Sequence, residues 1–388
     1  MIRVEEAEKI ILQEGRDFGA EQVSFDDCLG RVLAEELIAD RDLPPFNRVT
    51  MDGIAIIYRA FKNGTRLFKI KATQPAGENP IEITSDEECI EIMTGAALPA
   101  TTDTIIPYEE IKIDEGLAAI KTETLTKSQF IHPKGKDKKQ HETLAEAGQF
   151  ISPAIIAVAA TVGKTSLLVK KRPAVVIIST GDELTDIDET PAWFQIRRSN
   201  NHVLQAVLKQ YGMEADMLHL ADNPDILEEQ LGRSIAQYDI IIMSGGVSMG
   251  KYDFVPAALE KLQVKKLFHK VQQRPGKPFW FGKHAGGSLV FAFPGNPVSA
   301  FMCVHRYFLP WLKKSWQLKA ASSYAILDAD FTFKPALQYF LQVKLTNNEK
   351  GEWLGTPVEG NGSGDFINLL GTDAFMELPL ERTDFKKG

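Results

Sequence analysis

The side chains of this sequence that could do chemistry gather in four short polar segments, each of which follows an apolar run. The segments are Ser179-Thr180-Gly181-Asp182-Glu183, the stretch that begins at Asp222, Ser244-Gly245-Gly246-Val247-Ser248 leading on to Asp253, and Pro294-Gly295-Asn296-Pro297. Glycine-rich turns and helix N-termini present backbone N–H groups to anions. Carboxylates beside such turns would repel a phosphate unless a cation intervenes. The combination therefore favours Mg²⁺ with a phosphorylated or oxyanionic ligand.

Each segment also has a plain structural explanation. A Gly-Gly pair after a strand is often a tight turn, Asp182 could cap a helix, and Asp222 could simply precede a helix that starts at Pro224. The four segments share one position, after a predicted strand, and this favours a common site. The chain has neither a P-loop motif nor GxGxxG, so standard nucleotide-binding loops are not supported. Serine-hydrolase chemistry needs a base beside an oriented nucleophile, and the seven His residues are scattered along the chain, which disfavours it.

Two further groups of charged side chains could form binding sites. Arg274 and Lys277 flank a Pro-Gly pair, and cations so placed suit phosphate or molybdate-like oxyanions. A basic turn without a ligand is the other interpretation. His132 and His141 share a lysine-rich loop without nearby cysteines, which disfavours a metal site there.

The four segments must be positioned by the alternating strands and helices that run from Pro173 to about Leu312. Val175-Val176-Ile177-Ile178 is a continuous β-branched run, typical of a parallel strand buried on both faces. The pattern predicts further strands near 213–220, 240–243, 267–271, 279–281 and 289–293, and helices near 200–211, 224–237, 254–262 and 298–312. This alternation is typical of a mostly parallel α/β sheet, which binds ligands at the carboxyl ends of its strands.

The rest of the chain predicts helical and β-rich parts. Residues 3–20 have the apolar spacing of a helix, residues 27–38 predict a helix or an extended arm, and the apolar stretch 151–162 predicts a buried helix. Short strands separated by turns predict a small β-rich domain over about 53–125. They also predict a small barrel or sandwich beyond about residue 313.

The composition argues against several classes of protein. Lys and Arg total 44 against 52 Asp and Glu, a net charge of −8, so binding to nucleic acid or to a membrane surface is disfavoured. Cys28, Cys89 and Cys303 form no CxxC pair, which argues against zinc and disulfide frameworks and favours a reducing, cytoplasmic location. No apolar run approaches the roughly 18 residues of a membrane helix, and the acidic N-terminus lacks a signal-peptide pattern.

Together the motifs resemble those of the MoeA-type molybdopterin molybdenumtransferases, which are related to the E domain of gephyrin. The resemblance covers nearly the whole chain, in order. It is carried by Pro44-Pro45-Phe46 with Met51-Asp52-Gly53-Ile54-Ala55, Met93-Thr94-Gly95-Ala96-Ala97-Leu98-Pro99, Ser179-Thr180-Gly181-Asp182-Glu183-Leu184, Ser199-Asn200, Ser244-Gly245-Gly246-Val247-Ser248-Met249-Gly250 with Tyr252-Asp253, Pro275-Gly276-Lys277-Pro278-Phe279, and Pro294-Gly295-Asn296-Pro297-Val298-Ser299-Ala300.

The resemblance implies a multidomain α/β fold with four parts in each subunit. These are a helical segment over 1–42 and 140–170, a β-rich domain over 43–139, a central three-layer α/β domain over 171–312 that binds molybdopterin, and a C-terminal small β-barrel over 313–388. It also implies an elongated homodimer. The active cleft would lie between the α/β domain of one subunit and the β-rich domain of the other.

The resemblance further implies a late step of molybdenum cofactor biosynthesis. Family members insert molybdenum from molybdate into the dithiolene of adenylylated molybdopterin, and Mg²⁺-dependent hydrolysis releases AMP. A molybdopterin adenylyltransferase and acceptor molybdoenzymes are implied as partners. The sequence leaves open whether tungstate is accepted as well as molybdate, and which enzymes receive the product.

Residues that match the family's cleft form the expected site. Among the catalytic residues, Asp52 and Thr94 would come from the partner subunit and bind near molybdate or water, and Glu183 would contact the pterin or its phosphate. Asp222 and Asp253 would hold Mg²⁺ against the pyrophosphate or shape the pocket around it. The expected substrate-binding residues are Ser179, Thr180, Gly181, Asp182, Ser199, Asn200, Ser244, Gly245, Gly246, Ser248, Arg274, Lys277, Pro294, Gly295, Asn296 and Pro297.

The chain departs from the family pattern at a few positions near this cleft. Arg198 stands where the family usually has Asp, Lys136 where Glu is usual, and Asn47 where Asp is common. Arg274 replaces a frequent Lys and keeps the charge. Two acid-to-base changes beside an anion-binding cleft are expected to tune substrate affinity or to lower activity. They leave Asp137 as a weaker candidate for binding metal or molybdate.

Two other functions stay open at this point. Molybdopterin adenylyltransferases use a related α/β domain with similar loops, but they are usually much smaller. The Met51-Asp52-Gly53 segment and the C-terminal β-domain argue against that assignment. A diverged paralogue could instead act as a molybdopterin carrier or scaffold. The acidic residues Asp222 and Asp253, with Asp52, argue for an enzyme, because a scaffold has no need of them.

Overall fold

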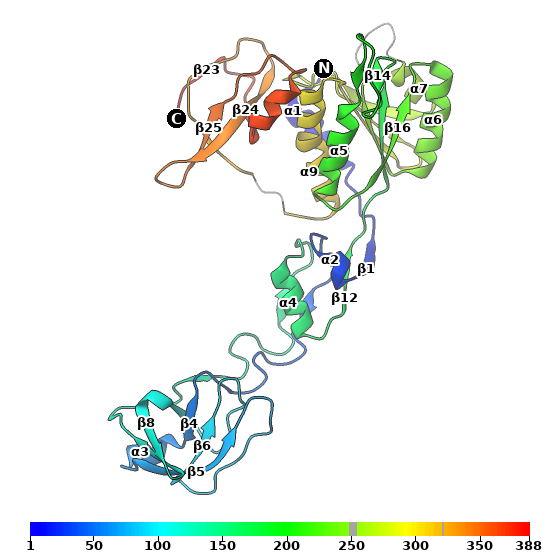
Figure 1. The fold of residues 1–388 in the computed structure, drawn as a ribbon. Coiled ribbons are helices and arrows are strands. Elements are labelled where there is room, and N and C mark those ends of the chain that lie inside the picture. Colours follow the sequence, from blue (N-terminus) through cyan, green and yellow to red (C-terminus); the bar gives the residue numbers. More distant parts are fainter. Residues whose placement is uncertain (248–253, 320–321) are drawn as a thin grey trace. The chain divides into compact units, whose positions relative to one another are not determined.

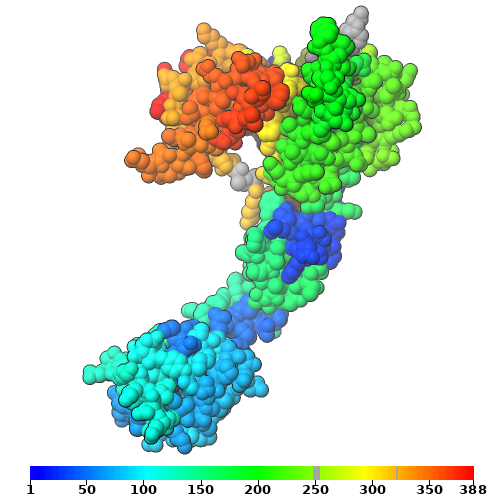
Figure 2. Space-filling model, viewed as in Figure 1, coloured from blue at the N-terminus to red at the C-terminus, as the bar shows by residue number. Residues whose placement is uncertain are grey.

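The computed structural model describes residues 1–247, 254–319 and 322–388 and divides into two compact units (Figures 1 and 2). The first, called here the α/β unit, comprises residues 1–34, 148–151 and 167–388. The second, the β-rich unit, comprises residues 35–147 and 152–166. Among the residues that are described, no helix is long and apolar enough to cross a membrane.

The α/β unit is built on a six-stranded sheet with the strand order β16-β13-β17-β21-β20-β18. Four neighbouring strands are parallel: β16 (Ala215–Leu220), β13 (Val175–Thr180), β17 (Ile240–Ser244) and β21 (Leu289–Phe293). Strand β20 (Trp280–His284) is antiparallel to both of its neighbours, β21 and the edge strand β18 (Val264–His269). The predicted sheet is thus mostly parallel. The edge differs because the turn from β20 to β21 is too short to hold a crossover helix.

Helices cover both faces of this sheet. One core cluster contains side chains of α5 (Ser199–Lys209), α8 (Pro297–Cys303) and α9 (Leu309–Ser315), whereas the other contains side chains of α6 (Pro224–Gln237) and α7 (Val255–Lys261). Neighbouring residues of β13 alternate between these clusters, as a strand buried on both faces requires. The predicted helix 298–312 is interrupted, because residues Val304–Phe308 form a π-helical turn between α8 and α9.

The N-terminal part differs from the sequence prediction. Helix α1 (Val4–Gln13) ends well before residue 20, and β1 (Ala20–Ser24) pairs with β12 (Ser166–Lys170). Gly19 takes a positive φ of 85° between them, a backbone conformation that does not continue a helix. In the 27–38 region only the short α2 (Phe25–Cys28) is helical, so the alternative of an extended arm describes it better.

The C-terminal residues form a second sheet. Its order is β19-β24-β25-β22, with β26 beside β24. Its strands are β19 (Gln273–Arg274), β22 (Ile326–Leu327), β24 (Gln338–Asn347), β25 (Trp353–Pro357) and β26 (Ala374–Leu378). Two shorter strands, β23 (Phe331–Thr332) and β27 (Asp384–Phe385), pair separately. Strand β19 lies in the loop before β20, so this loop is hydrogen-bonded to the C-terminal sheet.

The β-rich unit contains another six-stranded sheet, with the order β7-β4-β6-β5-β9-β8. The strands are β4 (Gly53–Ile56), β5 (Leu67–Gln74), β6 (Glu88–Ile92), β7 (Thr104–Pro107), β8 (Ile111–Asp114) and β9 (Leu117–Ile120), and the short helix α3 (Tyr58–Lys62) follows β4. Two-stranded ladders join β2 (Leu37–Ile38) to β11 (Thr143–Ala145) and β3 (Arg48–Val49) to β10 (Ile131–His132).

The helix predicted over 151–162 forms, but the prediction that it is buried is wrong. It is α4 (Pro153–Thr161), and Ala159 is its one buried residue. Ser152 caps it through a hydrogen bond from the Ile155 amide, and Pro153 occupies its first turn. The helix is apolar around most of its circumference, so the sequence contained no stripe from which a single buried face could be assigned.

Candidate functional site

The four polar segments leave the same edge of the α/β sheet. They follow β13, β16, β17 and β21, which are adjacent and parallel. The register pairs Thr180 with Leu220, Ser179 with Ser244, and Ser244 with Phe293, so these strands end at about the same level. The topology therefore brings together the loops predicted to bind substrate, at the edge where parallel sheets bind ligands.

Asn200 links two of these loops to helix α5. Its Nδ2 donates hydrogen bonds to Ser244 Oγ at 2.8 Å and to the Gly295 carbonyl at 2.7 Å. Asn200 lies in the first turn of α5, beside Ser199, so the helix start is tied to the ends of β17 and β21. A single amide thus fixes the relative positions of three predicted site segments.

Glycines let the loops pass close to one another. A Cβ on Gly245 would lie 2.9 Å from the Thr180 carbonyl oxygen, and a Cβ on Gly246 would lie 2.6 Å from Val255 Cγ2 and 2.7 Å from Thr180 Oγ1. Both glycines have positive φ, 99° and 68°, which side chains rarely adopt. Within the described part of the chain the buried Thr180 Oγ1 has no hydrogen-bond partner, so this hydroxyl remains available to a ligand.

Three acidic residues surround the ends of β13 and β16. The Asp222 amide donates to Asp182 Oδ1 at 3.1 Å, so these two carboxylate-bearing residues are neighbours. Glu183 follows Asp182, and a Cβ on Gly181 would lie 2.5 Å from Glu183 Oε2, so this carboxylate also lies beside the end of β13. The residues described contain no cluster of three potential metal ligands. Carboxylate oxygens nevertheless fit Mg²⁺, which often takes one or two protein carboxylates together with substrate phosphates.

Some predicted residues have other surroundings or lie outside the described ranges. The Ser179 hydroxyl is buried and bonded to His219 Nδ1 at 3.1 Å and Asn201 Nδ2 at 3.2 Å, so it joins β13, β16 and α5. The predicted residues Ser248 and Asp253 fall in the segment that the structure does not describe. His219 was not found from the sequence, because a lone histidine in a strand gives no signal of its own.

Arg198, the departure from the family pattern, forms an ion pair with Asp186. The pair closes a short ribbon in which β14 (Leu184–Thr185) runs beside β15 (Ile196–Arg197). The positive charge is therefore matched within a few residues of Glu183. Burial, and secondarily the charge of Arg198, lower the pKa of His219 below its ordinary value of 6.5.

The predicted cations lie on the loop between β19 and β20. Both Arg274 and Lys277 are exposed. Residue 274 pairs with Tyr339 of β24, and its guanidinium carbon lies 6.0 Å from the centre of the Phe333 ring. The contacts described for Arg274 are thus with the C-terminal sheet.

Ser363 is a site neighbour that sequence reasoning missed. Its Oγ accepts a hydrogen bond from Asn296 Nδ2 at 2.9 Å, and its carbonyl accepts one from the Val298 amide at 3.1 Å. The glycine-rich turn Gly360–Gly364 was recognised as a turn, but only the tertiary fold brings it to the start of α8. The Pro294–Pro297 loop is therefore supported from the C-terminal region.

In the β-rich unit, the predicted residues Asp52 and Thr94 lie against each other. The Thr94 amide donates to Asp52 Oδ1 at 2.6 Å, and both residues are exposed. This backbone hydrogen bond, followed by one from the Thr94 side chain, lowers the pKa of Asp52 below its ordinary value of 3.8. Asp52 is therefore ionised at neutral pH. In the same unit, Asp137 Oδ1 lies 2.7 Å from His132 Nε2.

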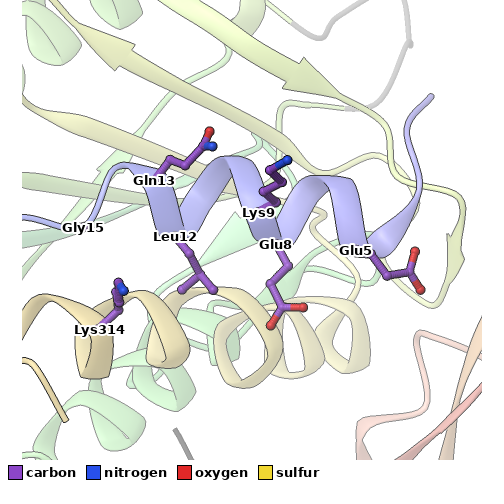
Figure 3. Close-up of a pocket in the computed structure, with 7 residues that line it drawn as sticks. All are labelled: Glu5, Glu8, Lys9, Leu12, Gln13, Gly15 and Lys314. Carbon is purple, nitrogen blue, oxygen red and sulfur yellow. The ribbon is translucent and has the colours of Figure 1, made fainter. Parts of the chain in front are cut away.

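A separate hollow lies between α1 and α9 (Figure 3). Its lining includes both acidic and basic side chains but none of the predicted site residues: Glu5, Glu8, Lys9, Leu12, Gln13, Gly15 and Lys314. It is thus distinct from the loops at the carboxyl edge of the sheet.

Comparisons with known proteins cover nearly the whole chain. Residues 2–163 match the family model of the MoeA N-terminal region (domain I and II), residues 176–314 that of a probable molybdopterin binding domain, and residues 324–388 that of the MoeA C-terminal region (domain IV). A molybdopterin molybdenumtransferase of Synechocystis sp. is 38% identical over 391 residues, which cover 100% of this chain and 98% of that relative. One from Staphylococcus epidermidis is 29% identical, with coverages of 100% and 94%.

A solved structure shares the fold. The crystal structure of a molybdopterin biosynthesis MoeA protein from Pyrococcus horikoshii OT3 matches with a TM-score of 0.86 and 25% identity, over 100% of this chain and 98% of that chain. The multidomain α/β fold predicted from the sequence is confirmed by these matches. The chain belongs to the family of the molybdopterin molybdenumtransferases and is a transferase of molybdenum cofactor biosynthesis.

Proposed function

We propose that this chain inserts molybdenum from molybdate into adenylylated molybdopterin, in a Mg²⁺-dependent reaction that releases AMP. The observation that carries the proposal is the arrangement around Asn200, whose amide ties the β17 loop to the β21 loop. Between these loops the backbone is bare of side chains at Gly245 and Gly295. Such a surface presents amide groups to an anionic ligand without steric obstruction.

The nucleotide half of the substrate would bind at the edge of the sheet. Thr180 Oγ1, which is buried without a described partner, would donate to a phosphate oxygen. Asp222, whose backbone amide donates to Asp182 Oδ1, would hold Mg²⁺ with Asp253. When bound, Mg²⁺ would neutralise charge on the pyrophosphate as AMP leaves. Glu183 would contact the pterin or its phosphate.

Molybdate, the second substrate, is a dianion and requires cations. Arg274 and Lys277 would balance the oxyanion charge. Asp52 and Thr94 would approach from the second subunit of a homodimer. Asp52 is suited to orient a water or an oxygen ligand, because its pKa is lowered and it is ionised.

The names of the relatives support this reaction. The curated proteins that match along the full chain are called molybdopterin molybdenumtransferase, and the central family model is that of a probable molybdopterin binding domain. That central match spans all four loops. We extend the activity that these names state to this chain.

AMP release is the direct test. Purified protein would be mixed with adenylylated molybdopterin, with and without molybdate and Mg²⁺, and AMP would be quantified by chromatography. We expect release that needs both ions and that is lost in Asp222→Ala. Asp225→Ala is the matched control, because Asp225 lies three residues on, exposed in the first turn of α6. Tight pterin binding without AMP release in the unmodified protein would contradict the proposal and favour a carrier.

A further inference from the structure

The loop that carries Arg274 and Lys277 rests on one buried tyrosine. Tyr307 is 1% exposed, and its hydroxyl donates a hydrogen bond to Gln273 Oε1 at the start of the loop. The same ring lies 5.0 Å from the ring of Phe279, at the end of the loop. One side chain therefore contacts both arms of the loop, through a polar group on one arm and an aromatic face on the other.

Gln273 forms a hydrogen bond within the loop itself. It is fully buried, and its Nε2 donates to the Gly276 carbonyl at 3.1 Å and lies 3.7 Å from Cys303 Sγ. The Gly276 carbonyl stands between the two cations in sequence. On the other arm, the Lys277 carbonyl accepts a hydrogen bond from the Val271 amide at 2.9 Å. The backbone on either side of both cations is thus held by buried contacts.

The loop is closely packed against its surroundings at Gly276. Its φ is +88°, and a Cβ there would lie 2.7 Å from Gln273 Nε2 and 2.8 Å from Cys303 Sγ. Cys303 and Tyr307 come from α8 and from the π-helical turn Val304–Phe308. π-helical turns are rare in proteins, and those that occur are often found at functional sites. Here the turn presents its tyrosine to the loop.

We propose that Tyr307 and Gln273 are positioning residues, which hold Arg274 and Lys277 in the conformation that binds an oxyanion of the substrate. This rests on the proposed function, in which these two cations bind molybdate. A buried amide and hydroxyl are not needed for stability alone, because apolar side chains of similar shape can fill a core equally well. A fully bonded polar pair instead specifies one geometry of the backbone it contacts.

Molybdate binding by the purified full-length protein tests the proposal. Isothermal titration would give the affinity, and AMP release at varied molybdate would separate KM from kcat. We expect Tyr307→Phe and Gln273→Met each to weaken molybdate binding by about three- to tenfold, the size expected when one net hydrogen bond is lost. KM for molybdate should rise by a similar factor, whereas kcat at saturating molybdate should stay near that of the unmodified protein.

Two further variants separate the possible failures. Ser288→Ala also removes a buried hydrogen bond of the α/β unit, from Ser288 Oγ to the Ile235 carbonyl, and it should lower the melting temperature without changing molybdate affinity. Lys277→Ala removes a cation outright. If Lys277→Ala binds molybdate normally, the role of the cations in the proposed function is wrong, and this inference falls with it. If Lys277→Ala binds weakly while Tyr307→Phe and Gln273→Met bind normally, positioning is overturned and the cation role stands.

Discussion

The two groups of candidate site residues are held in very different ways. In the α/β unit, the loops are joined by side-chain hydrogen bonds from Asn200 and approach one another at Gly245 and Gly246. In the β-rich unit, Asp52 is exposed and held by the amide and side chain of its neighbour Thr94. Contacts from several elements fix the geometry of the first group. In the second group, the hydrogen bonds from Thr94 favour the ionised form of Asp52, which stays exposed to solvent.

From this difference we expect the two groups of residues to contribute in different ways to the proposed reaction. A site assembled from several buried elements binds through shape, and small displacements are costly for it. An exposed, ionised carboxylate with one fixed neighbour can act on a ligand that is brought to it. We therefore expect substitutions in the α/β unit to affect both stability and activity, and substitutions at Asp52 to affect mainly activity.

The largest effect is expected for Asn200→Ala. The substitution removes both hydrogen bonds that tie α5 to the loops after β17 and β21, so the loops lose their relative position. We expect AMP release to fall about 100-fold, as a displacement of about 1 Å can cause. Gln205→Ala is the control, since this residue of the same helix bonds only the Ala215 carbonyl in the contacts described. Equal activity of the two variants would show that the Asn200 contacts do not matter.

Asp52→Ala should lower activity without a large loss of stability. The carboxylate is exposed and loses only the hydrogen bonds from Thr94, so its removal should lower the melting temperature only slightly. AMP release should nevertheless fall by at least about tenfold, because a positioned acid–base group contributes about 10²–10⁴-fold in many enzymes and water replaces part of that. Asp86→Ala serves as a control, because Asp86 is an exposed carboxylate of the same unit that pairs with Arg59. A large fall in the melting temperature of Asp52→Ala would contradict the expected difference between the two units.

Mixing the two inactive variants tests whether the groups meet across subunits. If the proposed homodimer shares its clefts, a mixed dimer of Asn200→Ala and Asp52→Ala contains one cleft free of both substitutions. Random exchange of subunits should then restore about a quarter of the activity. Dimers that complete each cleft within one chain would recover nothing, and that outcome would exclude the shared cleft.

Gly246→Ala should have a smaller effect than the substitutions above, and it should lower stability as well as activity. Its positive φ and its contacts with Val255 and Thr180 predict a loss of about 1–3 kcal/mol in the free energy of unfolding. Gly351→Ala isolates the contact contribution, because Gly351 has a similar φ of +78° in the same unit, but a Cβ there would meet nothing within 4 Å. Chemical denaturation should show a larger loss for Gly246→Ala. Equal losses would mean that the backbone conformation alone matters.

The sequence was informative where one local pattern determines the structure. The continuous apolar run of β13 and the Pro224 start of α6 predicted these elements closely, since strand burial and a proline in the first helical turn are local properties. The prediction of burial failed for α4, because its apolar residues mark no single face of the helix. The glycine-rich loops of the candidate site were recognised as loops that follow strands. Ser363, His219 and Tyr307 were not, because their importance comes from tertiary contacts that a single sequence does not encode locally.

The smallest predicted effect concerns His219 and the unusual Arg198. Burial first, and then the charge of Arg198, lower the pKa of His219, while the Ser179 bond and the carboxylates Asp182 and Glu183 raise it less. The unfolded chain therefore binds more protons at this residue, so stability rises with pH up to about 6.5 and falls as the pH drops below that value. We expect Arg198→Gln to raise the pKa of His219 and to weaken this pH dependence. NMR titration of the His219 ring and melting temperatures at acidic and neutral pH would measure both. An unchanged pKa would show that the Asp186 ion pair already cancels the Arg198 charge, and that the departure from the family residue is electrically silent at this edge of the sheet.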